Sequence, residues 1–369
     1  MTQTLVIGGG VAGLAAAYEL AADREVTLLE RESLLATHSS ARNAQIWLPV
    51  DDDATTGPLA CRSAELWTAL LGHEGRWLDR SGAVALAPAD AAAGLIRGAE
   101  KGGLEASVLD RARLSRLAPE LQAREQTALE VVGAGVFEPS VMMQALAAAC
   151  RERGVQVRKR AEVLAIETRS GRIAGATLAG PLDSKPEHIE ADEVVIAAGA
   201  WANTLAETIG LSTSLVPLRR HLVVLDVTRP SSSIVWSFDP AGEVYWRPES
   251  GGVLVSPCDE EESPPCLPTS EAKALELLEA RLQGIAPAWV DAPVRTSWAC
   301  LRTYADDREL LLGRDPRVQG LAWLAGLGGR GMTIGLAAGE LLGKAMRGGA
   351  DVLLDGMRPD RVGGNSVPR

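Results

Sequence analysis

Residues 4–30 read TLVIGGGVAGLAAAYELAADREVTLLE, and this stretch decides the fold. The apolar run 4–7 has the length of one buried strand, and the turn 8–13 that follows fits G-x-G-x-x-G. An alanine-rich helical run comes next, and a second β-like run, 25–29, ends at Glu30. The order of strand, glycine turn, helix, strand and terminal acid is typical of a Rossmann-type dinucleotide-binding unit.

The glycine turn and the terminal acid suit a bound dinucleotide. Gly8 permits the tight turn, Gly10 lets a pyrophosphate approach the backbone, and Gly13 allows helix and strand to pack closely. The helix N-terminus at Val11 and Ala12 offers unpaired N–H groups to phosphates. The acid at the end of the second strand accepts hydrogen bonds from ribose hydroxyls and disfavours the 2′-phosphate of NADP. A glycine-rich turn in another kind of α/β protein is the alternative.

Composition limits the class of protein. The chain has 369 residues, a length that suggests two domains, and 46% of the residues are hydrophobic. A net charge of −11 argues against nucleic-acid binding. No apolar run approaches the roughly 18–20 residues of a membrane span, and no basic segment or cleavage site is visible before the first strand, so we expect no signal peptide. We expect a cytoplasmic protein without a transmembrane segment, and leave open peripheral contact with the inner membrane.

The five cysteines and four histidines are scattered along the chain. No C-x-x-C pair and no ligand-spaced histidines occur among them. The pattern predicts a reducing compartment and no metal site.

Further candidate contacts follow the first unit. The segment 34–47, LLATHSSARNAQIW, concentrates polar donors that suit phosphate or ring-edge contacts, or else cap a helix. A buried strand ends in glycine within 193–202, and a second glycine-rich turn, 326–332, opens a helix over 334–346. Between them, 216–256 is β-rich and predicts antiparallel strands.

Six motifs, in one order along the whole chain, resemble the D-amino acid oxidase/dehydrogenase superfamily of FAD enzymes, with D-arginine dehydrogenase, glycine oxidase and sarcosine oxidase among its members. They are GGGVAG (8–13), HSSARNA (38–44), GVFEPSVMMQAL (135–146), EVVIAAGAWA (193–202), WACLRTYADDRELLLG (298–313) and AGLGGRGMTIGLAAGELL (325–342). The resemblance implies an α/β fold with a Rossmann-type, glutathione-reductase-like FAD-binding domain and a discontinuous α+β substrate domain built on an antiparallel sheet. The implied FAD-binding segments are 1–79, 137–213 and 301–358, the substrate-binding segments are 80–136 and 214–300, and 359–369 is a tail.

The resemblance also implies non-covalent FAD. The stretch 39–46 would line the pyrophosphate and isoalloxazine, Val163 would hold the adenine, and 329–333 would face the carbonyl edge of the ring. The residues that the resemblance assigns to the cofactor are Gly8, Gly10, Val11, Ala12, Gly13, Glu30, Arg31, Ser39, Ser40, Arg42, Asn43, Ala44, Gln45, Ile46, Val163, Ala198, Gly199, Trp201, Gly329, Arg330, Gly331, Met332 and Thr333.

The implied activity is oxidation of the C–N bond of an amino acid, of D configuration or an N-substituted glycine. A hydride passes to the flavin and an imino acid forms, and oxygen or a quinone re-oxidises the flavin. Arg302 and Tyr245 would grip the substrate carboxylate, with Arg220, or its neighbour Arg219, nearby. The alternatives are a surface ion pair for Arg302 with an aspartate at 306 or 307, and core packing for Tyr245.

Three departures from the family pattern leave other functions open. Arg330 replaces a tyrosine and would put a cation beside the flavin or a second carboxylate. Cys300 lies near the position of a flavin-linked cysteine in sarcosine oxidases, although Leu301 and Arg302 follow it as in non-covalent dehydrogenases. Ile46 and Trp47 stand near where D-arginine dehydrogenase has an active-site histidine and tyrosine, so arginine specificity does not carry over. A 2-hydroxy acid oxidase of the hydroxyglutarate type and a non-catalytic flavin-binding subunit are the alternatives.

Overall fold

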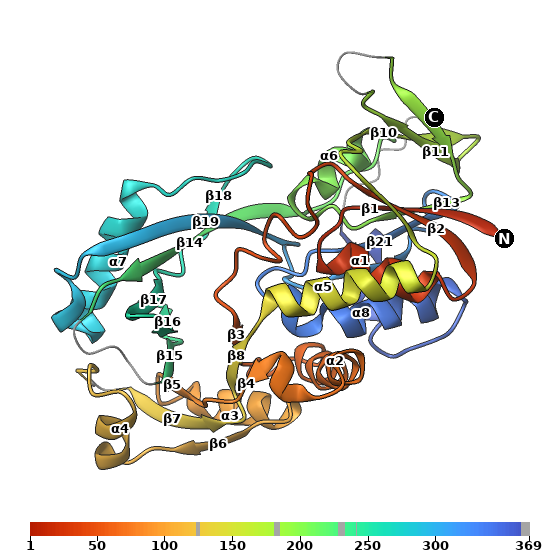
Figure 1. The fold of residues 1–369 in the computed structure, drawn as a ribbon. Helices are drawn as coiled ribbons and strands as arrows, with labels where there is room; N and C mark the ends of the chain where they lie inside the picture. The colour runs from red at the N-terminus through yellow and green to blue at the C-terminus, as the bar shows by residue number, and fades with distance from the viewer. Residues whose placement is uncertain (123–125, 181–184, 228–232, 241, 363–369) are drawn as a thin grey trace.

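A six-stranded sheet carries the N-terminal glycine turn (Figure 1). Its strands are β1 (Thr2–Ile7), β2 (Arg24–Glu30), β9 (Gln156–Lys159), β13 (Glu193–Ile196), β20 (Leu311–Arg314) and β21 (Leu321–Ala325). They lie in the order β20-β21-β13-β1-β2-β9, all parallel except β20. The computed structural model describes residues 1–122, 126–180, 185–227, 233–240 and 242–362, so 363–369 of the expected tail lie outside it. The predicted parallel α/β sheet is confirmed.

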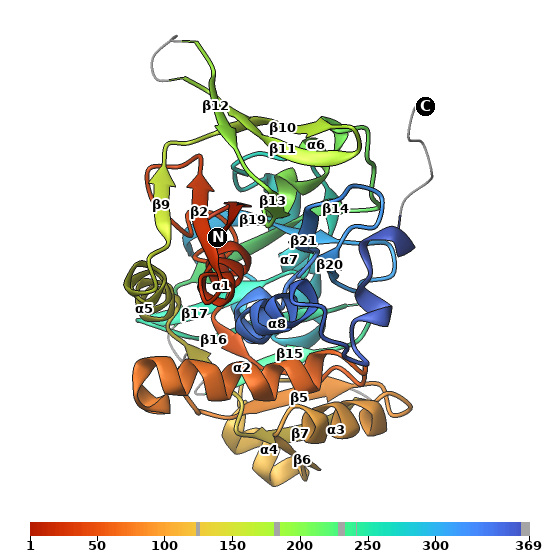
Figure 2. The same ribbon diagram turned by 90° about the vertical axis from the view of Figure 1, so that its right-hand side faces the viewer.

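Long helices cover one face of this sheet, as Figure 2 shows. They are α1 (Val11–Leu20), α5 (Pro139–Glu152) and α8 (Gly331–Met346), and α2 (Thr56–Leu71) packs on the outer side of α8 and α5. Helices α1 and α8 cross closely because small residues meet there: a Cβ at Gly339 would lie 2.6 Å from the Cβ of Ala15. Helix α8 begins three residues before the expected 334, so the glycine turn leads directly into its first turn.

A three-stranded antiparallel sheet and a short helix lie on the opposite face. They are β10 (Val163–Arg169), β11 (Arg172–Leu178), β12 (Glu187–Glu190) and α6 (Ala202–Glu207). Ile166, Ile173 and Leu205 pack with the parallel strands in one buried cluster. The sequence pattern predicts a strand pair over 154–166, and this is wrong: β9 and β10 belong to different sheets, and Arg160, with φ of 56°, lies where the chain turns between them.

The second large sheet is mixed. Its strands are β5 (Ala83–Ala87), β6 (Glu105–Val108), β7 (Thr127–Val132), β14 (Val216–Leu225), β15 (Ile234–Ser237), β16 (Val244–Glu249), β17 (Gly252–Ser256), β18 (Glu261–Glu262) and β19 (Val294–Tyr304). The order is β18-β14-β17-β16-β15-β5-β7-β6, with β19 also on β14. Neighbours are antiparallel except β15 and β5, which pair in parallel, so the second domain is built on a largely antiparallel sheet as expected.

The remaining elements cover this sheet or link it to the first. They are α3 (Ala92–Lys101), α4 (Arg111–Leu117), α7 (Ala272–Ile285), a small sheet of β3 (Ile46–Trp47), β4 (Leu78–Asp79) and β8 (Gly135–Phe137), and the short 3-10 helices Glu74–Arg76, Gly199–Trp201, Pro287–Trp289, Asp355–Met357 and Pro359–Arg361. Strands β14 and β19 are long and reach from the mixed sheet toward the parallel sheet (Figure 1). The expected segment boundary at 300/301 falls within β19.

Candidate active site

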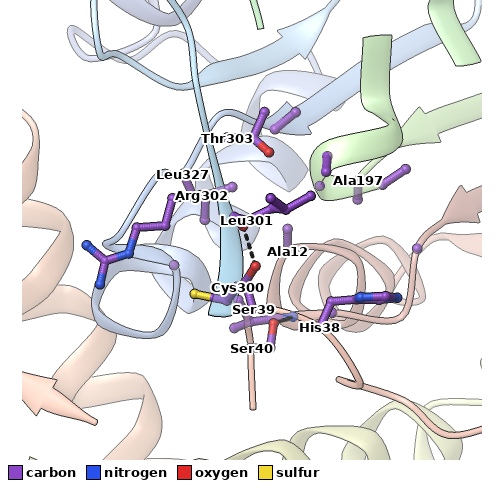
Figure 3. A pocket seen from close by; sticks show the side chains of 18 of the residues that line it. Ala12, His38, Ser39, Ser40, Ala197, Cys300, Leu301, Arg302, Thr303 and Leu327 are labelled. Carbon is purple, nitrogen blue, oxygen red and sulfur yellow. Dashed lines mark hydrogen bonds between the residues drawn. The ribbon is translucent and has the colours of Figure 1, made fainter. Parts of the chain in front are cut away.

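One cavity of about 450 Å³ lies where the two large sheets meet (Figure 3). The carboxyl ends of β1, β2 and β13 line it, together with the segment 39–46, strand β19 and the turn before α8. All residues assigned above to cofactor and substrate line this cavity except Gly13, Arg219, Arg220 and Arg330. The site is therefore assembled from segments that are far apart in the sequence.

The first glycine turn has the geometry that its motif predicts. Gly8 has φ of +113°, and its N–H donates to the carbonyl of Leu29 at 2.9 Å. A Cβ at Gly13 would lie 1.8 Å from the carbonyl oxygen of Gly8, so Gly13 is a packing residue. A Cβ at Gly10 would meet only the Oγ of Ser40, at 3.1 Å. The space beside Gly10 at the start of α1 is thus open to a ligand.

The terminal acid of β2 is buried and oriented by backbone donors. Its Oε2 accepts from the N–H of Gly9 at 2.7 Å, and its Oε1 accepts from the N–H of Glu32 at 2.8 Å. Glu30 thereby lies beside the glycine turn with its carboxylate fixed. The next side chain, Arg31, pairs with Glu32 at 3.0 Å and lies over the ring of Trp201, 4.0 Å from its centroid.

The segment 39–46 is tied to both sheets. Ser40 Oγ accepts from the N–H of Val11 at 3.0 Å, so it satisfies the start of α1 while lining the cavity. Ser39 Oγ donates to the carbonyl of Leu301, the bond drawn in Figure 3. The two interpretations left open for this polar segment, helix capping and ligand contact, are therefore compatible at Ser40.

Two further polar residues of this segment hold its shape. Arg42 Nε donates to the carbonyl of Ala299 at 3.2 Å, and the Arg42 carbonyl accepts from Trp298 Nε1 at 3.1 Å. Asn43 Oδ1 accepts from the N–H of Gln45 at 2.9 Å. These bonds fix the cavity wall against β19.

Arg302 and Tyr245 meet at the other end of the cavity. The Arg302 side chain is buried, with 9% of the residue exposed, and its Nη2 donates to the Tyr245 hydroxyl at 3.0 Å. The alternative ion pair is not formed, because Asp307 pairs with Arg361 at 2.7 Å and Asp306 accepts from a serine hydroxyl. Within the described part of the chain, no carboxylate oxygen lies within 4.0 Å of the Arg302 guanidinium.

Tyr245 is held in an aromatic wall and faces Arg302. It is fully buried, and its ring centroid lies 4.4 Å from that of Trp236 on the neighbouring strand. The next residue, Trp246, packs on Trp289 on the other face of the sheet. Burial raises the pKa of the Tyr245 phenol above its ordinary value, so the hydroxyl stays protonated. Core packing alone, the alternative for Tyr245, does not account for the hydrogen bond between its hydroxyl and Arg302.

Arg220 does not line the cavity. Its Nε donates to the carbonyl of Asp259 at 2.8 Å, and its Nη2 pairs with Glu260 at 3.0 Å. Arg219 pairs with Glu271 instead. Neither arginine therefore lies where the resemblance expects it: Glu260, in the acidic segment after β17, neutralises Arg220, and Glu271, directly before α7, neutralises Arg219.

Arg330 also points elsewhere. Its Nη1 donates to Thr56 Oγ1 at 2.6 Å and pairs with Asp53 at 3.2 Å, and its Nη2 donates to the carbonyl of Arg308 at 2.7 Å. The expectation that this cation faces the flavin or a second carboxylate is not met, because Asp53 already pairs with it. The backbone of Arg330 caps α8.

The glycines of the second turn make room for two side chains. A Cβ at Gly329 would lie 2.9 Å from Arg302 Nη1. Gly328 has φ of +55°, and a Cβ there would lie 2.0 Å from the Tyr304 ring. The G-L-G-G turn is thus required for Arg302 to pass beneath it.

Cys300 lines the cavity from β19, and Figure 3 shows its sulfur among the lining side chains. Burial raises the pKa of its thiol. The thiol is therefore held in its protonated, weakly nucleophilic form.

The donor set fits FAD. Space is open beside Gly10, a fixed carboxylate stands at Glu30, and the cavity extends from there to Arg302. Thr303 Oγ1 lines the cavity, is buried, and has no hydrogen-bond partner among the described residues. An orphaned hydroxyl of this kind calls for a polar ligand atom.

In the described part of the chain, no three histidine, cysteine or acidic side chains are grouped to hold a metal ion. No helix in that part has the length and apolarity needed to cross a bilayer.

Sequence reasoning missed several lining residues. His38 lies beside Trp201, with ring centroids 4.8 Å apart, and its Nε2 is 3.1 Å from Glu32. Trp236 comes from a strand whose apolar pattern gives no functional signal, whereas Thr303 directly follows Arg302 within a quoted motif. His38 could have been noticed, because it opens the HSSARNA motif.

The chain is similar to known proteins in sequence and fold. It is 27% identical over 375 residues to the mitochondrial pyruvate dehydrogenase phosphatase regulatory subunit of Mus musculus, covering 93% of this chain but only 41% of that protein. It is 26% identical over 355 residues to glycine oxidase of Geobacillus kaustophilus, covering 91% and 90% of the two chains.

Solved structures show the same fold over almost the whole chain. The L-proline dehydrogenase structure from P. horikoshii has a TM-score of 0.83 at 22% identity, covering 98% of this chain and 97% of that one. The glycine oxidase structure from Geobacillus kaustophilus has a TM-score of 0.77 at 24% identity, covering 99% and 100%. The sequence model of the DAO family, described as FAD dependent oxidoreductase, matches residues 3–345. The chain therefore belongs to the DAO family and is an FAD-dependent oxidoreductase.

Proposed function

We propose that this protein oxidises the C–N bond of an amino acid to an imino acid. The observation that carries the proposal is the buried Arg302 guanidinium, which bonds to the Tyr245 hydroxyl and has no carboxylate within 4.0 Å among the described residues. A buried cation in a ligand cavity without an acidic partner suits an anionic ligand group. An α-carboxylate supplies that charge with two oxygens for the guanidinium fork.

The side chains act by positioning the substrate. Arg302 fixes the plane of the carboxylate, and the neutral Tyr245 phenol adds a polar contact in a site that aromatic rings shield from water. Bound FAD supplies the acceptor for the hydride that leaves the α-carbon. The lone pair of a neutral amine forms the C=N bond as the hydride leaves, which gives an iminium without any proton transfer to a side chain. The iminium then loses one proton to solvent and becomes the neutral imino acid.

The substrate class is narrowed by resemblance. Similarity to glycine oxidase of Geobacillus kaustophilus supports an α-amino acid, and the motif resemblance supports a D-amino acid or an N-substituted glycine. We also propose that residues 1–79, 137–213 and 301–358 form the FAD-binding domain and that residues 80–136 and 214–300 form the substrate-binding domain. Oxygen or a quinone is the proposed electron acceptor.

One competing function has a specific observation behind it. The similarity to the mouse regulatory subunit fits a flavoprotein that regulates rather than catalyses. The function of a 2-hydroxy acid oxidase is less favoured, because Arg330, the residue offered for a second carboxylate, is paired with Asp53.

Anaerobic reduction of the FAD-loaded protein tests the proposal. We expect bleaching of the visible flavin absorption by one class within a panel of D-amino acids, L-amino acids, N-methyl amino acids and 2-hydroxy acids. Admitting air afterwards separates an oxidase from a dehydrogenase. Bleaching by 2-hydroxy acids alone would overturn the proposed bond, and an inert flavin would favour the regulatory alternative.

A further inference from the structure

Arg247 is a buried cation that the mechanism above does not use. It lies on β16, two residues after Tyr245, and only 7% of it is exposed. Strand residues two apart share a face, so Arg247 and Tyr245 both face the FAD side. Val244 and Trp246, on the other face, belong to the core beneath α7.

The Arg247 guanidinium holds the end of the segment 39–46. Its Nε donates to the carbonyl of Ala44 at 2.7 Å, and its Nη2 donates to Gln45 Oε1 at 2.8 Å. Both acceptor residues line the cavity. The remaining bonds anchor Arg247 to its own strand, at the carbonyl of Pro248 (2.8 Å) and at Glu249 (3.0 Å).

Gln45 needs such support because its backbone is strained. Its φ is +63°, in the left-handed region that side-chain-bearing residues seldom adopt. Its carbonyl accepts from the N–H of Phe137 at 2.9 Å, and its side chain is held by Arg247. A strained residue in a cavity wall persists only when neighbouring groups fix it.

We propose that Arg247 is a positioning residue for the flavin, which acts by holding Ala44 and Gln45 in the shape that the cofactor requires. The inference rests on FAD binding and does not depend on the substrate being an amino acid. It also gives β16 two roles, since the strand carries a substrate contact at Tyr245 and a cofactor support at Arg247. Lysine cannot replace this arginine fully, because four oxygens in different directions need the planar fork.

The test compares Arg247→Met with Arg295→Met. Arg295 binds the hairpin between β16 and β17 from its exposed side, at the carbonyl of Gly251 (2.8 Å), and does not touch the cavity. We measure the FAD dissociation constant of each apoprotein, the visible circular dichroism of the bound flavin, its midpoint potential, and the melting temperature of the apoprotein.

We expect Arg247→Met to weaken FAD binding by about tenfold or more, since two charge-assisted hydrogen bonds to the cavity wall are lost. The flavin dichroism and potential should also change, and Arg247→Lys should restore part of each. Arg295→Met should lower only the melting temperature. Equal FAD affinity, dichroism and potential in Arg247→Met and Arg295→Met would overturn the proposal.

A double-mutant cycle covers the case in which Arg247→Met folds poorly. Gln45→Ala and Arg247→Lys are measured singly and together. If Arg247 acts through Gln45, the double variant should lose less FAD-binding free energy than the sum of the losses in the two single variants. Additive effects would contradict the proposed route.

Discussion

The roles of the charged residues at this site follow from which partners they have. Arg302 is buried beside a phenol and has no carboxylate partner among the described residues, which supports the proposed binding of a substrate anion. Arg220 is buried as deeply but has Glu260, and Arg330 has Asp53. The sequence motifs place all three arginines near the substrate or the flavin, and only the structure shows that Arg302, unlike the other two, lines the cavity without a carboxylate partner among the described residues.

At Arg302, replacement by alanine should separate substrate binding from cofactor binding. We expect Arg302→Ala to retain FAD and to raise the substrate KM by about 100-fold or more, because two charge-assisted hydrogen bonds are removed. Steady-state kinetics with the substrate identified by bleaching, together with flavin content, measure this. Tyr245→Phe is the milder companion, with a rise of about tenfold. A KM unchanged in Arg302→Ala would remove Arg302 from the substrate site.

At Cys300, the flavin should be released by denaturation. Burial raises the pKa of the thiol, so little thiolate is present to bond to the cofactor. Precipitation with acid should leave yellow FAD in the supernatant for both the natural protein and Cys300→Ser. Flavin remaining on the pellet of the natural protein, but not on that of Cys300→Ser, would show a covalent link.

At the scale of elements, two glycines of one turn should behave differently. A Cβ at Gly13 would lie 1.8 Å from the Gly8 carbonyl, so Gly13→Ala should prevent the β1–α1 packing and stop folding. A Cβ at Gly10 meets only Ser40 Oγ, so Gly10→Ala should fold with normal circular dichroism and lose FAD. Normal FAD content in Gly10→Ala would show that phosphates do not approach there.

At the amino ends of the strands, Glu193 joins four strands away from the cavity. It pairs with Arg24 of β2 at 2.8 Å and Arg314 of β20 at 2.7 Å, and accepts from Thr4 of β1. Burial alone would raise the pKa of this carboxyl, but the bonds and charges of both arginines outweigh it and hold the pKa below its ordinary value. The resulting stability is present above the unfolded-state pKa of about 4.3 and is lost as pH falls through the lower folded-state value.

Glu193→Gln should therefore lower the free energy of unfolding by about 1–3 kcal/mol at neutral pH. The difference from the natural protein should shrink as the pH falls below about 4. Melting temperatures between pH 3 and 7 measure this, with Glu187→Gln, which breaks an exposed pair with Arg158, as the control. A difference that stays constant down to pH 3 would mean that the charge of Glu193 is irrelevant.

Sequence patterns predicted elements better than they predicted partners. The strand, turn and helix around Gly8, and the helix opened by the second glycine turn, follow from local spacing, so both were found. Where Arg330 and Arg220 point is decided by Asp53 and Glu260, which are distant in the sequence, so local spacing could not predict the direction of either side chain.

The same limit explains what was missed. The contact of Arg247 with Ala44 spans 203 residues and no local pattern announces it. Its only sequence signal is the alternation in β16, where a charged residue shares a face with Tyr245. The parallel pairing of β15 with β5 likewise joins segments whose order in a sheet no local periodicity decides.

At the scale of the whole molecule, the cavity walls come from both large sheets, so the cofactor should stabilise the protein as a unit. Residues of β1, β13 and the turn before α8 line it on one side, and β15, β16 and β19 line it on the other. A ligand that binds only the folded state adds about 2.7 kcal/mol to the free energy of unfolding at 100 times its Kd.

We therefore expect the melting temperature of the apoprotein to rise steadily with added FAD, in one cooperative transition. ADP, which has only the adenosine and pyrophosphate portion, should give a smaller rise because it leaves the Arg302 end of the cavity empty. Gly10→Ala is the matched control and should show no rise with either ligand. If FAD and ADP raise the melting temperature equally at saturation, the isoalloxazine ring contributes nothing to joining the two sheets, and the stabilisation belongs to the parallel sheet alone.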